Sequence, residues 1–229
     1  SPRPYPPANG AGWNNTPVTV EYDCLDALSG PDSCQRPDVF STEGVHTGST
    51  APIADLAGNV ALVTNFVVRI DMTPPAVTTV RSPQANAAGW SRSDVTVSWV
   101  CDDTMSGVQI CPHSEVLGEG ADQSVTGEAI DVAGNQRSVT VSDVSVDKTS
   151  PMITFNRLPL ANAAGWNNED VTVSYTCSDA LSGTASCTGP AVFSAEAENQ
   201  QSIGEAVDVA GNTSSVAVSG INIDKTSPA

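Results

Sequence analysis

The sequence is poor in basic side chains, in histidine and in long apolar runs. Its 229 residues contain 9 Lys and Arg and 2 His against 26 Asp and Glu, which gives a formal net charge of -17. Nucleic-acid binding needs a basic face that neutralises phosphates, so the composition disfavours that partner. The longest mostly apolar stretch, Val60–Ile70, is interrupted by polar residues and falls well short of the roughly 20 residues that cross a bilayer. We therefore expect no membrane insertion.

A tandem repeat organises the whole chain. Three copies follow one another with a period of 76 or 77 residues, which is typical of a repeat architecture. Each copy carries a Gly-Trp pair, a strand-like segment that ends in cysteine, a second cysteine ten residues later, an Asp-X-Ala-Gly-Asn segment and a closing Asp-X-Thr-X-Pro. The Gly-Trp pairs are Gly12-Trp13, Gly89-Trp90 and Gly165-Trp166.

The repeat predicts three modules, over residues 1–74, 75–150 and 151–229. Each is just large enough to sustain its own core. Copies are joined through Thr-Pro-Pro or Thr-Ser-Pro, and proline favours an extended, semi-rigid junction. The first copy has only Ser-Pro-Arg-Pro where the others have an apolar first strand, so we expect it to lack that strand.

Alternation of side chains predicts the fold class. Val18, Val20, Tyr22 and Cys24 alternate with polar residues, which is typical of a half-buried strand, and the same pattern follows in the other two copies. Asp-X-Ala-Gly-Asn lies between β-rich runs and predicts a hairpin turn. No stretch has apolar residues spaced three and four apart, as an amphipathic helix would. We therefore expect an all-β protein of three tandem immunoglobulin-like β-sandwiches, each of about seven strands, in an extended array.

Six cysteines in three equally spaced pairs indicate one short-range disulfide in each copy. The predicted bonds are Cys24–Cys34, Cys101–Cys111 and Cys177–Cys187. Persistent disulfides form in an oxidising compartment, so we expect an extracellular or cell-surface protein. Zinc is the alternative for cysteine pairs, but the ten-residue spacing differs from a zinc knuckle and no histidine recurs beside the pairs.

The chain offers no recognisable catalytic constellation. His46 and His113 occupy different places in their copies, lack arranged partners and are expected in exposed loops. The glycines lie in turns and form no phosphate-binding loop. We therefore expect no enzyme activity and no catalytic residue.

Recurring aspartates raise the question of calcium, which takes six to eight oxygen ligands. Carboxylates where one sandwich faces the next would supply such ligands and stiffen the array; the alternative is a local turn-forming role, which aspartate often has. The candidates from the loop and the closing segment are Asp26, Asp71, Asp103, Asp147, Asp179 and Asp224. Hairpin aspartates recur as Asp55, Asp131 and Asp208, and a glutamate recurs as Glu43, Glu119 and Glu196. We expect no cofactor, with calcium as the one alternative that the recurring aspartates leave open.

These motifs resemble the bacterial immunoglobulin-like repeats that occur in tandem in extracellular and surface proteins, with a hyalin-repeat-like pattern. The resemblance covers all 229 residues and rests on Val-Thr-Val-Ser-Tyr-Thr-Cys, Asp-Val-Ala-Gly-Asn and Ile-Asp-Lys-Thr-Ser-Pro. It implies β-sandwich modules that serve as stalks, spacers or adhesive arrays.

We expect a non-catalytic structural or adhesive array that extends a functional head or forms a filament. Its expected partners are neighbouring repeats or other copies of the same chain, with a surface or glycan receptor as a further partner. The alternatives are a carbohydrate- or ligand-binding module with Trp13, Trp90 and Trp166 exposed as a sugar platform, or an accessory segment of a secreted enzyme.

Overall fold

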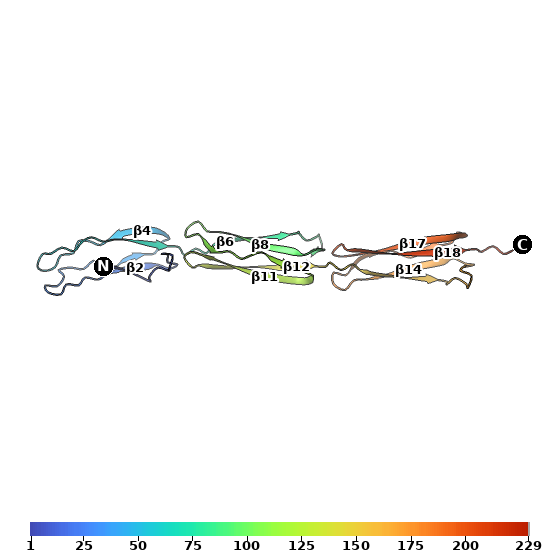
Figure 1. Cartoon of the computed structure of the whole chain (residues 1–229), viewed down its shortest axis with the longest axis horizontal. Coiled ribbons are helices and arrows are strands. Elements are labelled where there is room, and N and C mark those ends of the chain that lie inside the picture. The colour runs from blue at the N-terminus through green and yellow to red at the C-terminus, as the bar shows by residue number, and fades with distance from the viewer. Residues whose placement is uncertain (229) are drawn as a thin grey trace. The chain divides into compact units, whose positions relative to one another are not determined.

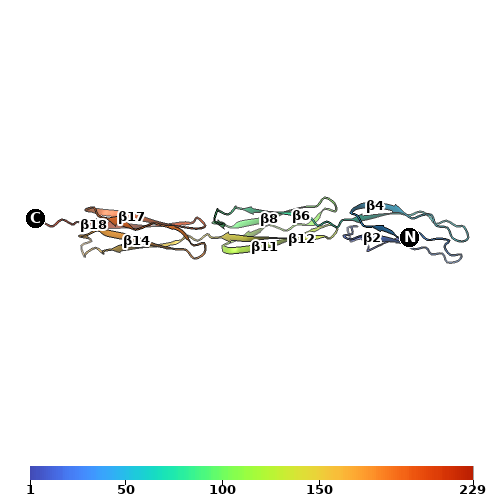
Figure 2. The same cartoon turned by 180° about the vertical axis from the view of Figure 1, so that it is seen from behind.

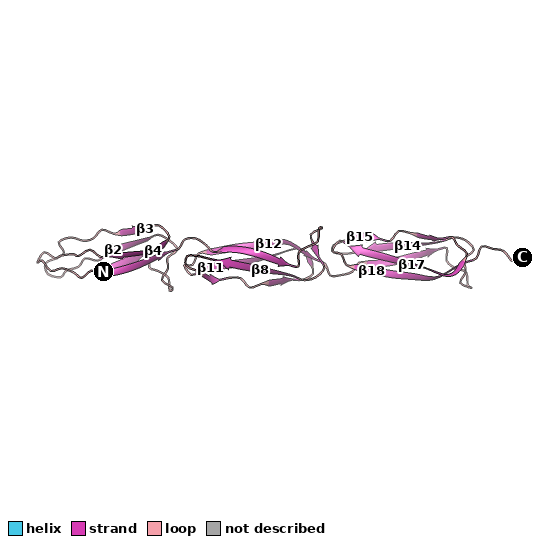
Figure 3. Cartoon of the chain, turned by 90° about the horizontal axis from the view of Figure 1, so that it is seen from above, coloured by secondary structure: helices cyan, strands magenta, loops and turns pink. Residues whose placement is uncertain are grey.

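The computed structural model describes residues 1–228, and within them the ordered elements are β-strands joined by turns, with no helix (Figure 3). The first copy contains β1 (Pro2–Tyr5), β2 (Val18–Tyr22), β3 (Asp38–Phe40), β4 (Gly44–Ser49) and β5 (Asn65–Ile70). The second contains β6 (Ala76–Ser82), β7 (Trp90–Ser91), β8 (Val95–Asp102), β9 (Val108–Ile110), β10 (Glu115–Leu117), β11 (Gly120–Asp131) and β12 (Gln136–Val146). The third contains β13 (Met152–Leu158), β14 (Val171–Ser178), β15 (Thr184–Cys187), β16 (Ala191–Phe193), β17 (Ala197–Asp208) and β18 (Thr213–Ile223).

The structure divides into two compact units whose boundary crosses the second copy. One unit comprises Ser1–Val80, Ser98–Ser114 and Thr126–Thr140; the other comprises Arg81–Val97, Glu115–Val125 and the chain from Val141 onwards. Each unit therefore holds one outer copy and the part of the second copy that packs against it. The predicted module boundaries near residues 74 and 150 stay a prediction.

The third copy shows the sandwich most completely. One sheet has the order β13-β14-β16 and the other β15-β17-β18, and β14 lies opposite β17 in both side views (Figures 1 and 2). The core between the sheets contains Val171 and Val173 of β14 with Val218, Ile221 and Ile223 of β18, all at most 3% exposed. Alternate residues of each sheet thus point inwards, as in a two-layer β-sandwich.

The predicted inward face is confirmed in the first copy as well. Val18, Val20 and Tyr22 of β2 form a core with Val68 and Ile70 of β5, between the sheet β1-β2-β3 and the pair β4-β5. The second copy buries the equivalent residues Val95, Val97 and Trp99 of β8. The all-β sandwich fold is therefore the observed one.

The first copy does have a first strand, contrary to the expectation from its Ser-Pro-Arg-Pro segment. Pro2–Tyr5 pairs antiparallel with β2, with Pro2 opposite Tyr22 and Pro4 opposite Val20. β1 is an edge strand, and alternate residues of an edge strand need no N–H for the ladder, so proline at every second position is tolerated.

The first copy has five strands among the described residues, whereas about seven were expected. In the other copies Asp-X-Ala-Gly-Asn turns a long hairpin, β11-β12 and β17-β18, as predicted. In the first copy, β4 ends at Ser49 and β5 begins at Asn65. Pro52 replaces Glu128 and Glu205 there, and Pro31 replaces Val108 of β9. Proline has no backbone N–H, and only the isolated bridges Pro31–Asp55 and Ala54–Val60 stand here in place of the longer ladders of the other copies.

Candidate functional site: the junctions between copies

The recurring acidic motifs meet where one copy is joined to the next. Junction one brings Asp71, which closes the first copy, against the loop Asp103–Gly107 and the hairpin turn Asp131–Asn135 of the second. Junction two brings Asp147 against the equivalent loop and turn of the third copy. All residues of junction one belong to one compact unit and all those of junction two to the other.

Donors of the second copy bond to Asp71 across junction one. The Ser106 N–H donates to Asp71 Oδ2 over 3.0 Å, and Asn135 Nδ2 donates to the Asp71 carbonyl oxygen over 2.8 Å. The other carboxylate oxygen of Asp71 accepts from the N–H of Thr73 at 3.1 Å. Asp71 thus joins its own chain segment to two loops of the following copy.

Junction two repeats the same bonds between equivalent atoms. Asp147 Oδ2 accepts from the Ser182 N–H at 3.0 Å, and the Asp147 carbonyl accepts from Asn212 Nδ2 at 2.8 Å. The N–H of Thr149 donates to Asp147 Oδ1 at 3.0 Å. Because the two junctions agree atom by atom, the Asp-X-Thr-X-Pro motif is a specific docking segment rather than a generic linker.

In the first two copies, the segment before the Gly-Trp pair adds another contact to the junction. Asn9 Oδ1 accepts from the N–H groups of Ala11 and Trp13, which fixes the turn, while Asn9 Nδ2 donates 2.8 Å to the Val132 carbonyl of the second copy. Asn86 makes the equivalent 2.8 Å bond to the Val209 carbonyl of the third. The asparagine that precedes Gly-Trp therefore both shapes its turn and holds the next copy.

The recurring glutamate positions the closing segment. Glu43 Oε1 accepts from the Met72 N–H at 2.8 Å and the Thr73 hydroxyl at 2.7 Å. Glu119 accepts from the Thr149 hydroxyl at 2.6 Å, and Glu196 from the Lys225 N–H at 2.7 Å. In each copy the glutamate thus holds the residues next to the junction aspartate in place.

Three carboxylates converge at each junction. Asp71, Asp103 and Asp131 offer oxygen atoms within 4.8 Å of one another, as do Asp147, Asp179 and Asp208. The junction and hairpin aspartates are at most 1% exposed, and the loop aspartates are half-buried. No Lys or Arg of residues 1–228 forms an ion pair with either triad. The negative charges are met by N–H donors, among them Gly107 on Asp103 at 2.6 Å and Gly134 on Asp131 at 2.7 Å.

The hydrogen bonds at junction two favour the ionised form of Asp147. Burial acts to raise its pKa, but bonds from Ser182 and Thr149 outweigh this effect and hold the pKa of the carboxyl below its ordinary value of 3.8. An ionised Asp147 is therefore the state that accepts the bonds of the third copy.

This pKa shift predicts acid sensitivity of the second unit. The native pKa lies below that of the unfolded chain, so the stabilisation is complete above pH 3.8 and is lost as the pH falls through the native value. Urea unfolding followed from pH 7 down to about pH 2 should show a falling free energy of unfolding in the acidic limb. Asp147→Asn should flatten that limb. An equally steep limb in the variant would show that Asp147 is not responsible.

The structure brings together four of the six predicted calcium candidates. Asp71 and Asp103 meet at junction one, and Asp147 and Asp179 at junction two. Each pair is completed by a hairpin aspartate, Asp131 or Asp208, which recurs in the sequence but was not among the six candidates. Asp26 and Asp224 are exposed and lie outside both triads. Each triad contains one aspartate of one copy and two of the next. The positions of the aspartates within a single copy do not show this arrangement.

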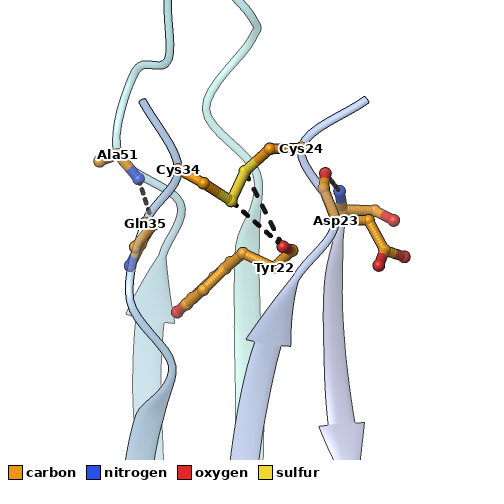
Figure 4. The surroundings of a disulfide bond; sticks show 7 residues. Tyr22, Asp23, Cys24, Cys34, Gln35 and Ala51 are labelled. Carbon is orange, nitrogen blue, oxygen red and sulfur yellow. Dashed lines mark hydrogen bonds between the residues drawn. A yellow bond between two sulfur atoms is a disulfide. The ribbon is translucent and has the colours of Figure 1, made fainter. Parts of the chain in front are cut away.

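The three predicted disulfides are present. Cys24–Cys34, Cys101–Cys111 and Cys177–Cys187 have Cα–Cα distances of 5.7, 5.9 and 5.8 Å. In the first copy both sulfur atoms lie against the Tyr22 carbonyl, and Gln35 next to Cys34 accepts from the Ala51 N–H (Figure 4). The disulfide therefore lies at the end of β2, next to the core residue Tyr22.

The side chain of Tyr22 is held at its other end. The Tyr22 hydroxyl donates to Asp38, and burial together with this bond raises the pKa of Tyr22 to about 12.

The exposure of the tryptophans and of one histidine differs from what the sequence predicted. Trp13, Trp90 and Trp166 are half-buried, whereas a sugar platform was expected to expose them. His113 is exposed, but His46 lies in β4, half-buried, with Nε2 2.8 Å from the Thr42 carbonyl oxygen and its ring 5.2 Å from that of Phe40. The prediction of an exposed loop for His46 is therefore wrong, because β4 begins at Gly44 and includes it.

No family model and no curated protein matches this chain. Among solved structures, it is similar to a 1.5-MDa bacterial ice-binding adhesin studied for host cell surface retention, at 14% identity and a TM-score of 0.36 over 95% of each chain. It is also similar to fibronectin(III)-like modules of Clostridium thermocellum CbhA, at 16% identity and a TM-score of 0.30 over 65% of this chain and 95% of that one. A Ca²⁺-stabilized adhesin of an Antarctic bacterium that binds ice shares 14% identity at a TM-score of 0.30, over 93% of this chain and 69% of that one. These values assign neither a family nor a function.

Over the described residues, no helix is long and apolar enough to cross a membrane.

Proposed function

We propose that the chain is a non-catalytic structural or adhesive repeat array of an extracellular or cell-surface protein, acting as a stalk, spacer or filament subunit. The observation that carries this proposal is the exact repetition of the junction. Asp71 and Asp147 make the same bonds, through the same atoms, to equivalent loops of the next copy. Selection for a fixed connection between copies accounts for such repetition, whereas a flexible tether needs no shared geometry.

The disulfides and the cores support this proposal. Each copy carries its own disulfide, which is the usual device by which a small domain persists in an oxidising compartment. Each outer copy also has its own apolar cluster, which stabilises it as a separate module. The connections between copies are then what the proposed role as a stalk or spacer depends on. The described residues contain no arrangement of His46 or His113 with a nucleophile and an acid that would act as a triad.

Backbone ¹⁵N relaxation tests whether the junctions fix the copies. We expect amides of β2, β8 and β14 to report one shared, slow rotational correlation time, because hydrogen-bonded junctions couple the tumbling of neighbouring copies. Asp71→Asn should give the first copy faster tumbling of its own. Asp224→Asn is the matched control, since this aspartate has the same motif position but is exposed, and within residues 1–228 its carboxylate accepts only a local bond from the Thr226 N–H.

Independent tumbling of the three copies in the unaltered chain would contradict the proposal. Equal effects of Asp71→Asn and Asp224→Asn would also contradict it, because a junction-specific role requires the first variant alone to release a copy.

We also propose that Ca²⁺ binds the two aspartate triads and strengthens the junctions. The support is the convergence of three carboxylates within 4.8 Å, two of them buried, whose observed partners in the described chain are N–H groups and, at Asp179, the Ser182 hydroxyl. Calcium prefers such hard oxygen ligands, and a divalent cation reduces the repulsion among three neighbouring negative charges.

Removing calcium tests this second proposal. Saturating Ca²⁺ at about 100 times its Kd should stabilise the chelated protein by about 2.7 kcal/mol in a urea titration, because the ion binds only the native junction. Asp103→Asn should remove the response of junction one, while Asp26→Asn, the equivalent loop position in the first copy, should not. Identical unfolding curves in Ca²⁺ and in chelator would show that the triads need no metal.

A further inference from the structure

One residue of junction one has a chemical property that its counterpart at junction two lacks. Asn9 is followed by Gly10, and this is the only Asn-Gly pair in the sequence. The equivalent asparagines, Asn86 and Asn162, are followed by alanine. Asparagine before glycine readily loses its side-chain amide, because the glycine nitrogen reaches the neighbouring side chain without hindrance from a Cβ atom. Asn9 is therefore a candidate for spontaneous chemical modification.

The structure gives no conformational reason for glycine at position 10. The backbone of Gly10 lies outside the left-handed region that favours glycine, and a Cβ atom there would have no heavy atom within 4 Å beyond the adjoining residues. The other two copies carry alanine at this position, as Ala87 and Ala163. The fold therefore accepts either residue, and the glycine changes the chemistry of Asn9 rather than the shape of the turn.

The attacking group of the reaction is free and reachable from solvent. The Gly10 N–H has no hydrogen-bond acceptor among residues 1–228, and both Asn9 and Gly10 are exposed. Because the two reacting groups belong to neighbouring residues, the chain itself holds them close together. Water, which the second step consumes, therefore also has access to the turn.

The side-chain carbonyl of Asn9 is polarised by two donors. Its oxygen, Oδ1, accepts from the N–H groups of Ala11 and Trp13, both at 3.0 Å. When a nucleophile adds to Cγ, negative charge develops on this oxygen, and N–H groups already directed at it stabilise that charge as in an oxyanion hole. The turn thus favours attack at Asn9 Cγ while it leaves the attacking nitrogen free.

We propose that Asn9 deamidates spontaneously through a succinimide, and that its conversion to isoaspartate or aspartate loosens junction one but not junction two. The reaction depends on the turn alone, whereas its consequence rests on the proposed function of the junctions as fixed connections. The array thereby carries a slow, irreversible loss of stiffness at one defined position.

The atoms balance with water as the one reactant from outside the chain. The Gly10 nitrogen loses its proton and forms a bond to Asn9 Cγ. The Cγ–Nδ2 bond then breaks, and Nδ2 takes up a proton from water and leaves as ammonia. Water next adds to one of the two carbonyl carbons of the ring. Opening at the backbone carbonyl of Asn9 leaves the chain running through Cγ, which is isoaspartate, and opening at Cγ gives aspartate.

Both products remove the donor that Asn9 gives to the second copy. Asn9 Nδ2 donates to the Val132 carbonyl over 2.8 Å, and a carboxylate oxygen in its place would face that carbonyl oxygen with no proton between them. Isoaspartate also lengthens the backbone of a turn that is closed by Asn9 N–H to the Trp13 carbonyl at 2.8 Å and by Gly12 N–H to the Asn9 carbonyl at 2.9 Å. Conversion therefore replaces a bond across the junction by a repulsion.

Val132 connects Asn9 with the rest of junction one. The Val132 N–H donates to the Gly107 carbonyl at 2.9 Å, and the N–H of the next residue, Ala133, donates to the Ser106 hydroxyl at 3.2 Å. The Ser106 N–H in turn donates to the junction aspartate of the first copy. Hydrogen exchange of the Ser106 amide therefore reports whether loss of the Asn9 bond opens the junction.

Asn86 provides the comparison within the same molecule. Its Oδ1 accepts from two N–H groups of its own turn, at 2.9 and 3.0 Å, and its Nδ2 donates to the Val209 carbonyl at 2.8 Å. The two turns thus share these hydrogen bonds and differ in the residue that follows the asparagine, Gly10 or Ala87. We therefore expect Asn86 to stay intact under conditions that convert Asn9.

Peptide mapping by mass spectrometry, after incubation at neutral and at mildly alkaline pH, tests the modification. The unaltered chain should gain the mass difference between an amide and a carboxyl group at Asn9 and not at Asn86. Conversion should be faster at the higher pH, because the attacking nitrogen must lose a proton. Electron-transfer fragmentation should identify isoaspartate among the products. Gly10→Ala should keep Asn9 intact, and Ala87→Gly should create a second reacting site at Asn86.

Hydrogen exchange before and after incubation tests the consequence for the junctions. The Ser106 amide should exchange about tenfold faster after conversion, because one hydrogen bond across the junction is lost, while that of Ser182 at junction two should not change. Asn9→Asp introduces one of the two products directly and should accelerate Ser106 without incubation. Incubated Gly10→Ala should show no acceleration.

Two results would overturn the proposal. One is an intact Asn9 in the unaltered chain when a synthetic peptide of residues 8–13 is converted in the same buffer. The other is conversion of Asn9 with no change at Ser106. Failure of the proposed function is seen separately, because in a chain without fixed junctions Ser106 would exchange fast, and the copies would tumble independently, before any conversion.

Discussion

Replacing Cys24 and Cys34 together with alanine is expected to unfold the first copy locally, whereas loss of a disulfide in the third copy should be tolerated. Each bond spans a sequence separation of 10, so each contributes roughly 3 kcal/mol by restricting the unfolded chain. Small domains are stable by only about 5–15 kcal/mol in total. The first copy has the shorter sheets, because β4 and β5 have 6 residues each where β17 and β18 have 12 and 11.

Native-state hydrogen exchange of the core strands measures this difference. Amides of β2 should lose protection in Cys24→Ala/Cys34→Ala, while amides of β14 should keep most of theirs in Cys177→Ala/Cys187→Ala. Because the two closed loops have equal length, the entropic contribution is matched and only the surrounding sheet differs. Equal losses of amide protection in the two copies would mean that the length of the strands does not determine how well each copy tolerates the loss of its disulfide.

Asp71→Asn is expected to lower the free energy of unfolding of the first compact unit by about 2 kcal/mol in chelator. The Asp71 side chain is fully buried and accepts N–H bonds from Thr73 and Ser106 on its two oxygens. Asparagine keeps one acceptor and turns an NH₂ group towards the other N–H, so one buried donor loses its partner and the charge-assisted bond is lost.

Asp224→Asn provides the comparison for this effect. The change is chemically the same and removes the same type of local bond, to Thr226, but no loop of a following copy lies against Asp224 in the described structure. Its expected cost in dilute protein is within about 0.5 kcal/mol, as for most surface substitutions. Urea unfolding curves with equal slopes would give the difference directly. A similar cost for both variants would assign the effect to the turn itself rather than to the junction.

Much of the fold was predictable because its signals are local. Alternation at Val18, Val20 and Tyr22 identified the buried face, and the equal cysteine spacing identified all three disulfides. The short sheet of the first copy was not predicted, although two residues without a backbone N–H, Pro31 and Pro52, stand in this part of the sequence. Its edge strand at Pro2–Tyr5 was missed because proline is tolerated only where its missing N–H would point away from the neighbouring strand. That direction depends on the register with β2, which the sequence does not show.

The junctions were only partly predictable, since they depend on contacts between copies. The sequence pointed to Asp71 and Asp103 as candidates that face a neighbour, but it did not show that Asp131 joins them or that Asn135 bonds the backbone of Asp71. Asp-X-Ala-Gly-Asn recurs with its final Asn unchanged in all three copies. The Asn side chain bonds the aspartate of its own turn in every copy, so its recurrence did not reveal the second bond that Asn135 makes to Asp71.

The most direct test of the account is the exchange rate of three equivalent serine amides in dilute, unaltered protein. The N–H groups of Ser106 and Ser182 donate to junction aspartates of the preceding copies, whereas the N–H of Ser29, at the same loop position, has no acceptor outside its own loop among residues 1–228. The account predicts slow exchange at Ser106 and Ser182 and fast exchange at Ser29. Comparable exchange at all three would contradict it, because the loop alone would then explain the protection and the junctions would hold nothing in place.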